Sequence, residues 1–105
     1  MKTVINKINE MPIEDFADIN NLTMLVNERQ TPLESSGRFY ARFSNVDVLD
    51  GSFLVGEHGN GSTPEEAIKK YANQISFKTI VCSATSIKRK EIKVPRLTYE
   101  AQDDS

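Results

Sequence analysis

The strongest local signal in this sequence is the stretch of residues 63–75, TPEEAIKKYANQI. Thr63 can cap a helix, Pro64 suits the first helical position, and Glu66 lies three residues after the cap, where its carboxylate can reach the Thr63 amide. The apolar residues recur at steps of three and four, which places them on one helix face. These residues are Ala67, Ile68, Tyr71, Ala72 and Ile75. The stretch therefore predicts an amphipathic helix over 64–75 that packs on one face of a sheet.

Strands are predicted on both sides of this helix. Residues 38–44, RFYARFS, alternate polar and apolar side chains, as a half-buried strand does. Residues 22–27 precede them as a first strand, and residues 79–83 and 91–94 follow the helix as two more. Pro12 begins a segment with early acidic residues, which predicts a short N-terminal helix.

The dipeptide Asp50-Gly51 predicts a hairpin, because a type I′ turn needs positive φ at both central residues. This turn would pair Val48 with Phe53. The Gly-rich residues 56–61 are interpreted as a flexible linker into the helix. The resulting prediction is an α+β domain over residues 1–97, with one antiparallel sheet of four to five strands in the order α-β-β-β-α-β-β, followed by a flexible acidic tail over 98–105.

Length and charge limit the classes of protein. A chain of 105 residues suits one domain with one modest core. No apolar run approaches the roughly 20 residues of a membrane helix, and none suits a signal peptide, so we expect a cytoplasmic protein without membrane contact. Residues 1–66 carry five Lys/Arg against eleven Asp/Glu, and residues 67–97 carry eight against one. This asymmetry permits an acidic face, a basic face or a mixture of the two.

Catalytic and metal chemistry have few candidate residues. The chain contains one histidine, His58, in a Gly-rich loop, and one cysteine, Cys82, in a β-branched run typical of a buried strand. A catalytic pair would need these side chains in contact, and a structural zinc site would need four ligands. Residues 46–57 resemble a calcium loop in spacing, but Val46 and Val48 stand where oxygen ligands are required. We therefore expect no enzymatic activity, metal, cofactor or small-molecule substrate.

Two sets of charged residues are candidates for binding. The acidic set, a candidate face for a protein partner, is Glu28, Glu34, Asp47, Asp50, Glu57, Glu65 and Glu66. The basic set, a candidate face for nucleic-acid phosphates, is Lys88, Arg89, Lys90, Lys93 and Arg96. An edge strand protected from aggregation by lysines would explain the basic set equally well.

The order α-β-β-β-α up to Ile75 resembles the double-stranded RNA-binding domain. Members of that family grip phosphates with lysines at the start of the second helix, where this chain has Glu65 and Glu66. Acidic residues at this place favour the acidic set over the basic one.

A second resemblance covers residues 39–43, 59–72 and 89–95, with GNGSTPEEAI at 59–68 as its most distinctive part. These segments resemble small accessory proteins encoded by phages and prophages of Gram-positive bacteria. In size and acidity the chain is similar to anti-CRISPR inhibitors of Cas9. The resemblance implies an inhibitor that docks on a host protein or ribonucleoprotein, with the positively charged channel of the Cas9–guide RNA complex as the candidate target. The alternative is a small nucleic-acid-binding accessory protein that uses the basic set.

Overall fold

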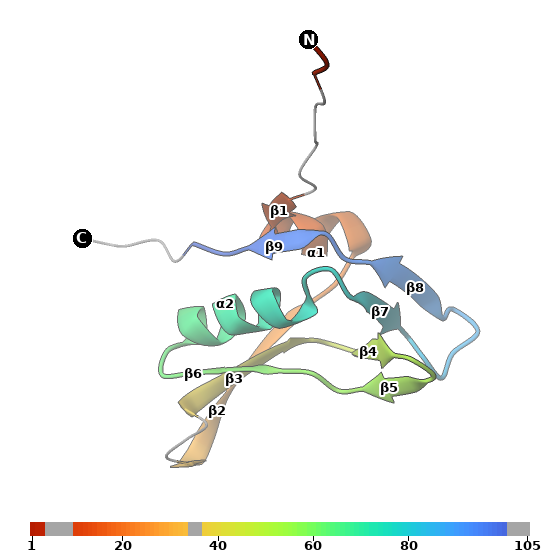
Figure 1. The fold of residues 1–105 in the computed structure, drawn as a ribbon. Coiled ribbons are helices and arrows are strands. Elements are labelled where there is room, and N and C mark those ends of the chain that lie inside the picture. Colours follow the sequence, from red (N-terminus) through yellow and green to blue (C-terminus); the bar gives the residue numbers. More distant parts are fainter. Residues whose placement is uncertain (4–9, 34–36, 101–105) are drawn as a thin grey trace.

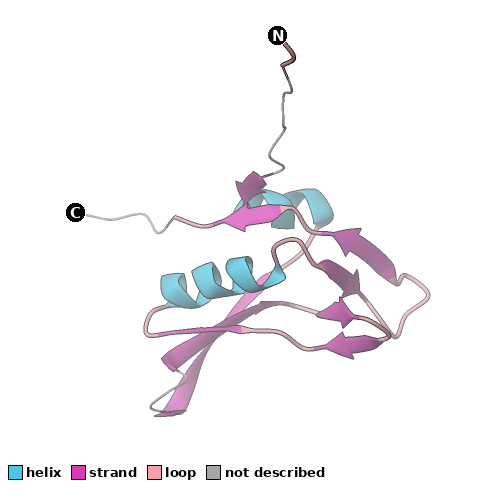
Figure 2. Ribbon diagram, in the orientation of Figure 1, coloured by secondary structure: helices cyan, strands magenta, loops and turns pink. Residues whose placement is uncertain are grey.

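The computed structural model describes residues 1–3, 10–33 and 37–100. The elements in chain order are β1 (Glu10–Pro12), α1 (Ile13–Asn20), β2 (Met24–Leu33), β3 (Gly37–Phe43), β4 (Val46–Asp50), β5 (Phe53–Val55), β6 (Gly59–Gly61), α2 (Pro64–Ile75), β7 (Thr79–Cys82), β8 (Lys90–Lys93) and β9 (Arg96–Thr98). Figures 1 and 2 show α1 beside β1 and β9, and α2 between β9 and the strands β3 and β6. Among the described residues, no helix is long and apolar enough to cross a membrane.

The predicted sheet and element order are wrong. The described chain is mostly β, and its strands form three sheets, in the orders β1-β9, β2-β3-β6 and β5-β4-β7-β8. The first of these is a parallel pair that joins the two ends of the chain, with Met11 opposite Leu97. A three-residue strand is too short to show an alternating pattern, so β1 and β9 leave no periodic signal in the sequence.

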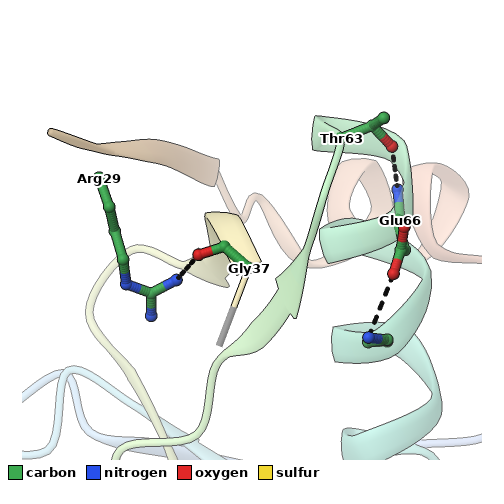
Figure 3. Close-up of polar contacts among 5 residues, drawn as sticks. Arg29, Gly37, Thr63 and Glu66 are labelled. Carbon is green, nitrogen blue, oxygen red and sulfur yellow. Dashed lines mark hydrogen bonds and ion pairs between the residues drawn. The ribbon is translucent and has the colours of Figure 1, made fainter. Parts of the chain in front are cut away.

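Helix α2 spans the predicted residues, Pro64–Ile75. The Glu66 amide donates to the Thr63 hydroxyl at 3.1 Å, and the Glu66 carboxylate forms a 3.2 Å salt bridge with Lys70 (Figure 3). The helix packs against β3, β6 and β9 (Figure 1). Helix α2 therefore contacts two sheets, through β3 and β6 of one and β9 of another.

The core is centred on an aromatic group shared by α1, β3 and α2. Tyr71 is fully buried, and its ring lies edge-on to Phe43 with 5.4 Å between ring centroids. Phe43 also contacts Phe16 of α1, at 6.3 Å. Burial raises the pKa of the Tyr71 hydroxyl, so this group stays protonated at neutral pH. Both helices therefore pack against β3 in one hydrophobic core.

The Gly-rich segment before α2 is a strand and not a flexible linker. In β6, Gly59 pairs with Ala41 and Gly61 pairs with Phe39 of β3. Both glycines are buried, and a Cβ atom on Gly59 would lie 2.3 Å from the Ala67 carbonyl oxygen. Glycine is therefore required because the backbone of α2 comes this close to the strand.

The β4–β5 hairpin has a different register from the predicted one. Val48 pairs with Val55, and Asp50 pairs with Phe53, so the turn residues are Gly51 and Ser52. Of these two, only Gly51 has a positive φ, 61°. A two-residue turn with glycine first is of type II′. The prediction was wrong because it placed Asp50 inside the turn.

The chain after β9 continues into the fold. Thr98 ends β9, and Tyr99 packs against the core. The first residues of the expected tail therefore belong to the folded part, and residues 101–105 lie outside the described residues.

Candidate functional site

The structure distributes the predicted acidic set over several elements. Glu28 lies on β2, Asp47 and Asp50 lie on β4, Glu57 follows β5, and Glu65 and Glu66 lie in the first turn of α2. Glu34 lies outside the described residues. The described members of the predicted set therefore come from β2, β4, the segment after β5 and α2.

Most of the described members of the acidic set are also ion-paired. Glu28 bridges to Arg38 across the β2–β3 hairpin. Asp47 lies 3.8 Å from Arg42, and Glu57 lies 3.8 Å from Lys78. Glu66 pairs with Lys70, as described above. A carboxylate that already faces a cation of its own chain attracts a further cation less strongly, so these residues are weaker candidates for a docking surface than unpaired ones.

A smaller acidic surface forms where β1, α1, α2 and the end of β9 meet, and we call it the Tyr99 surface. Its acidic and aromatic residues are Glu10, Glu14, Glu65, Glu66, Tyr99 and Glu100, and one cation, Lys69 of α2, lines it as well. The parallel pairing of β1 with β9 brings Pro12 opposite Thr98, which places the start of α1 beside Tyr99. In Figure 1 the start of α2 and the end of β9 lie on the same side of the molecule.

Three carboxylates of the Tyr99 surface lack a salt bridge within the described part of the chain. They are Glu14, Glu65 and Glu100, whereas Glu10 lies 3.8 Å from Arg96 and Glu66 pairs with Lys70. Burial is the main cause that raises the pKa of the Tyr99 hydroxyl, and the negative charges of Glu65 and Glu14 raise it further. The surface is therefore negative around an aromatic residue.

An apolar pocket of about 170 Å³ lies beside Tyr99. Its wall is formed by apolar side chains from both helices and two strands, and Glu14 stands among them. The apolar lining residues are Ile13, Ala17, Met24, Phe43, Ile68 and Tyr99. The Tyr99 surface thus combines an apolar centre with acidic neighbours.

Of the residues that form this surface, the sequence predicted only Glu65 and Glu66 as binding residues. Glu14 could have been found from its place after Pro12 at the start of a predicted helix. Tyr99 and Glu100 could not, because their position depends on the pairing of β9 with a distant strand. The pairing of β1 with β9 is a long-range contact, and no local sequence pattern indicates it.

The basic set is spread over the loop before β8, the edge strand β8 and strand β9, and its two lysines on β8 point to opposite faces. Lys90 pairs with Cys82 and Lys93 pairs with Thr79, and residues at an odd spacing on a strand point to opposite faces. Arg96 lies 3.8 Å from Glu10. Lys88 and Arg89 lie in the loop before β8, and, like Lys90 and Lys93, they are exposed without a salt bridge among the described residues.

His58 and Cys82 are held in separate environments. The His58 ring lies edge-on to Tyr40 at 5.7 Å, and Arg29 stacks on Tyr40 at 4.7 Å. Arg29 also donates to the Gly37 carbonyl at 3.1 Å (Figure 3). Burial raises the pKa of the Cys82 thiol, which disfavours the nucleophilic thiolate. Among the described residues, no group of His, Cys, Asp or Glu is arranged to hold a metal ion.

Comparison of the chain with protein-family models, curated proteins and solved structures finds no match.

Proposed function

We propose that this chain is a non-catalytic inhibitor that docks on a host nucleic-acid enzyme through the Tyr99 surface, with the Cas9–guide RNA complex as the candidate partner. The observation that supports this function best is the apolar pocket beside Tyr99, which Glu14 lines and which shares Tyr99 with a neighbouring pocket lined by Glu65 and Glu100. Binding hot spots in protein interfaces have this form, with a desolvated apolar centre inside a polar ring.

The charge of the surface indicates the chemistry of the partner. Glu14, Glu65 and Glu100 have no cation of their own within the described part of the chain. A basic partner can therefore pair with them without first breaking an ion pair of this chain. A channel that binds nucleic acid is lined with positive charge, and Cas9 contains one around its heteroduplex.

Inhibition of DNA cleavage tests the proposed partner directly. Purified Cas9–guide complex is incubated with increasing amounts of this protein, and cleavage of a matched DNA target is measured. We expect cleavage to fall in proportion to the amount of this protein that is added, and to stop when one molecule is present for each Cas9–guide complex. Unchanged cleavage at a large excess would rule out Cas9 as the partner.

Charge reversal tests the surface, with Glu14→Lys and Glu65→Lys combined in one variant. Like charges brought together at an interface cost several kcal/mol. Because about 1.4 kcal/mol corresponds to a tenfold change in affinity, we expect the variant to bind the partner at least about 100-fold more weakly. The measurement is the concentration that gives half-maximal inhibition.

The matched control combines Asp18→Lys and Glu91→Lys. Both residues are exposed acids outside the Tyr99 surface, and the change in net charge is the same. We expect this control to inhibit nearly as well as the natural chain. If the two variants lost the same amount of inhibition, then inhibition would depend on the net charge of the chain and not on the Tyr99 surface. Circular dichroism checks that both variants remain folded.

A second candidate function is direct binding of nucleic acid by the basic residues near β8. The observation that favours it is the absence of salt bridges to Lys88, Arg89, Lys90 and Lys93 within the described residues. A mobility-shift titration of a single-stranded oligonucleotide should show binding at low salt that weakens steeply at high salt, because phosphate contacts release counterions. No shift at low salt would exclude this function.

A further inference from the structure

A polar pocket of about 330 Å³ lies where the end of α1, the β3–β4 turn and the β7–β8 loop meet, and we call it the Ser83 pocket. This volume lies within the range of small-ligand sites, roughly 300–1,000 Å³. Among the residues described, no carboxylate lines the pocket. Its position at the far end of α1 from Glu14 separates it from the Tyr99 surface.

Neutral hydrogen-bonding groups form much of the pocket wall. Hydroxyl groups come from Thr23, Ser44 and Ser83, and amides come from Asn21 and Asn45. The Asn45 amide donates to the Ser83 hydroxyl at 3.2 Å, which joins the β3–β4 turn to the β7–β8 loop. Such side chains are the common neutral partners of phosphate oxygens.

Two lysines supply positive charge. Lys88 and Lys90 line the Ser83 pocket and have no salt bridge within the described part of the chain. The loop that carries Lys88 is ordered by hydrogen bonds, because the Lys88 amide donates to the Ser86 hydroxyl at 3.1 Å and the Ser86 amide donates to the Ser83 carbonyl at 2.9 Å. The lysines therefore extend from a fixed backbone.

The carbonyl groups at the end of α1 would repel an anion, but they are largely satisfied. Asn20 donates its side-chain amide to the Phe16 carbonyl at 2.9 Å. The Leu22 amide donates to the Ala17 carbonyl at 2.8 Å. These bonds reduce the negative character of the helix end beside the pocket.

Unusual backbone conformations gather at the Ser83 pocket. Four non-glycine residues of the described chain have positive φ, and three of them line this pocket: Asn21, Asn45 and Ser83, with φ of 56°, 59° and 54°. Asparagine is common in the left-handed region, but serine is not, and glycine would adopt it without strain. Strained backbone tends to persist at functional sites, and here it accompanies a hydroxyl that lines the pocket.

We propose that the Ser83 pocket binds a phosphate group, with Lys88 and Lys90 supplying the charge and the hydroxyl and amide groups supplying the neutral donors. The phosphate can belong to the backbone of a nucleic-acid strand or to a small phosphate compound. The first source rests on the second candidate function above. Neither source depends on the Tyr99 surface.

The first test measures binding of a fluorescently labelled single-stranded oligonucleotide by anisotropy at low salt. Lys88→Gln combined with Lys90→Gln should weaken binding about tenfold, since hydrogen bonds to charged groups are among the stronger ones. The slope of log Kd against log salt concentration should become shallower by about 0.7, because the contact with one phosphate of a single strand is lost. The control combines Lys2→Gln with Lys69→Gln, two exposed lysines outside the basic set and outside the pocket, which removes the same charge and should weaken binding less than about threefold.

The second test uses inorganic phosphate and amide shifts in two-dimensional NMR, with chloride at equal ionic strength as the reference. Phosphate should shift the backbone amide signals of positions 83 and 88 in the natural chain. It should leave the signals of these two positions unchanged in the Lys88→Gln, Lys90→Gln variant. Ser83→Gly should keep or raise the melting temperature, because glycine relieves the strain, and should weaken the response to phosphate.

The two tests together decide both the pocket and its ligand. Strand binding that depends on Lys88 and Lys90 identifies the nucleic-acid backbone as the source, and phosphate shifts without strand binding identify a small phosphate compound. If both lysine variants lost the same amount of oligonucleotide affinity, and phosphate caused no amide shift at Ser83, the proposed phosphate site would be wrong. The second candidate function, direct binding of nucleic acid, would still stand. No strand binding and no phosphate shifts would overturn the pocket and the second candidate function together.

Discussion

Gly59→Ala is expected to destabilise the chain by more than about 3 kcal/mol, a large part of the roughly 5–15 kcal/mol by which domains are stable. The added Cβ would lie 2.3 Å from the Ala67 carbonyl oxygen and 2.3 Å from the Tyr71 amide nitrogen. Both atoms belong to the backbone of α2, so no flexible side chain can move aside. The helix must shift away from β6, and the core around Tyr71 must open.

Urea unfolding followed by circular dichroism measures this effect. The control is Gly56→Ala, whose Cβ would have its nearest neighbour, an Arg42 side-chain nitrogen, at an ordinary 3.6 Å. This variant should remain within about 0.5 kcal/mol of the natural chain, as surface substitutions usually do. If Gly59→Ala were equally mild, α2 could not lie as close to β6 as the structure places it.

The role of Gly59 shows how far local patterns can be read. The cap at Thr63 and the apolar spacing of α2 predicted the helix bounds correctly, because both are determined within a few residues. The same local reading interpreted the neighbouring glycines as a linker. Their buried position depends on the distance between α2 and β3, which no local pattern records.

Hairpin register shows a second limit. Asp50-Gly51 indicated the hairpin correctly, but the turn begins one residue later than predicted. A type I′ turn and a type II′ turn both use glycine, and they differ in whether it is the second or the first central residue. The pairing of Val48 with Val55 is set by the packing of β4 on β7 as well as by the turn.

The candidate surfaces depended even more on long-range structure. The sequence shows that charge is uneven along the chain, and in the structure four of the six described members of the acidic set pair with nearby cations. Only the pairing of β1 with β9 brings Glu14 and Tyr99 together. The Ser83 pocket likewise collects residues from distant segments, so its hydroxyl and amide groups had no pattern to identify them.

The two proposed surfaces lie at the two ends of α1. Glu14, in the first turn, belongs to the acidic Tyr99 surface, and Asn20, at the end, belongs to the Ser83 pocket with its lysines. The two sites share no lining residue, so substitutions can test each of them separately.

Tyr71→Ala is expected to destabilise the chain by about 3–5 kcal/mol, the range found for large aromatic residues replaced in a core. Tyr71 is 0% exposed, and its ring is held between α2 and Phe43 of β3. Removing the ring leaves a cavity beneath both helices. Thermal and urea unfolding should show the loss, and both proposed surfaces should be lost with it, because α1 and α2 position their residues.

Tyr71→Phe should behave in the opposite way. The Tyr71 hydroxyl is buried without a hydrogen-bond partner among the described residues, although the Phe43 backbone lies near enough to offset part of the rise in its pKa. Removing an unsatisfied polar group while keeping the ring should leave stability unchanged or raise it by about 1 kcal/mol. A loss of more than about 1 kcal/mol would show that the hydroxyl is bonded in the native protein. Because the ring remains, this variant should keep inhibition and phosphate binding, which separates the stability of the core from the action of the surfaces.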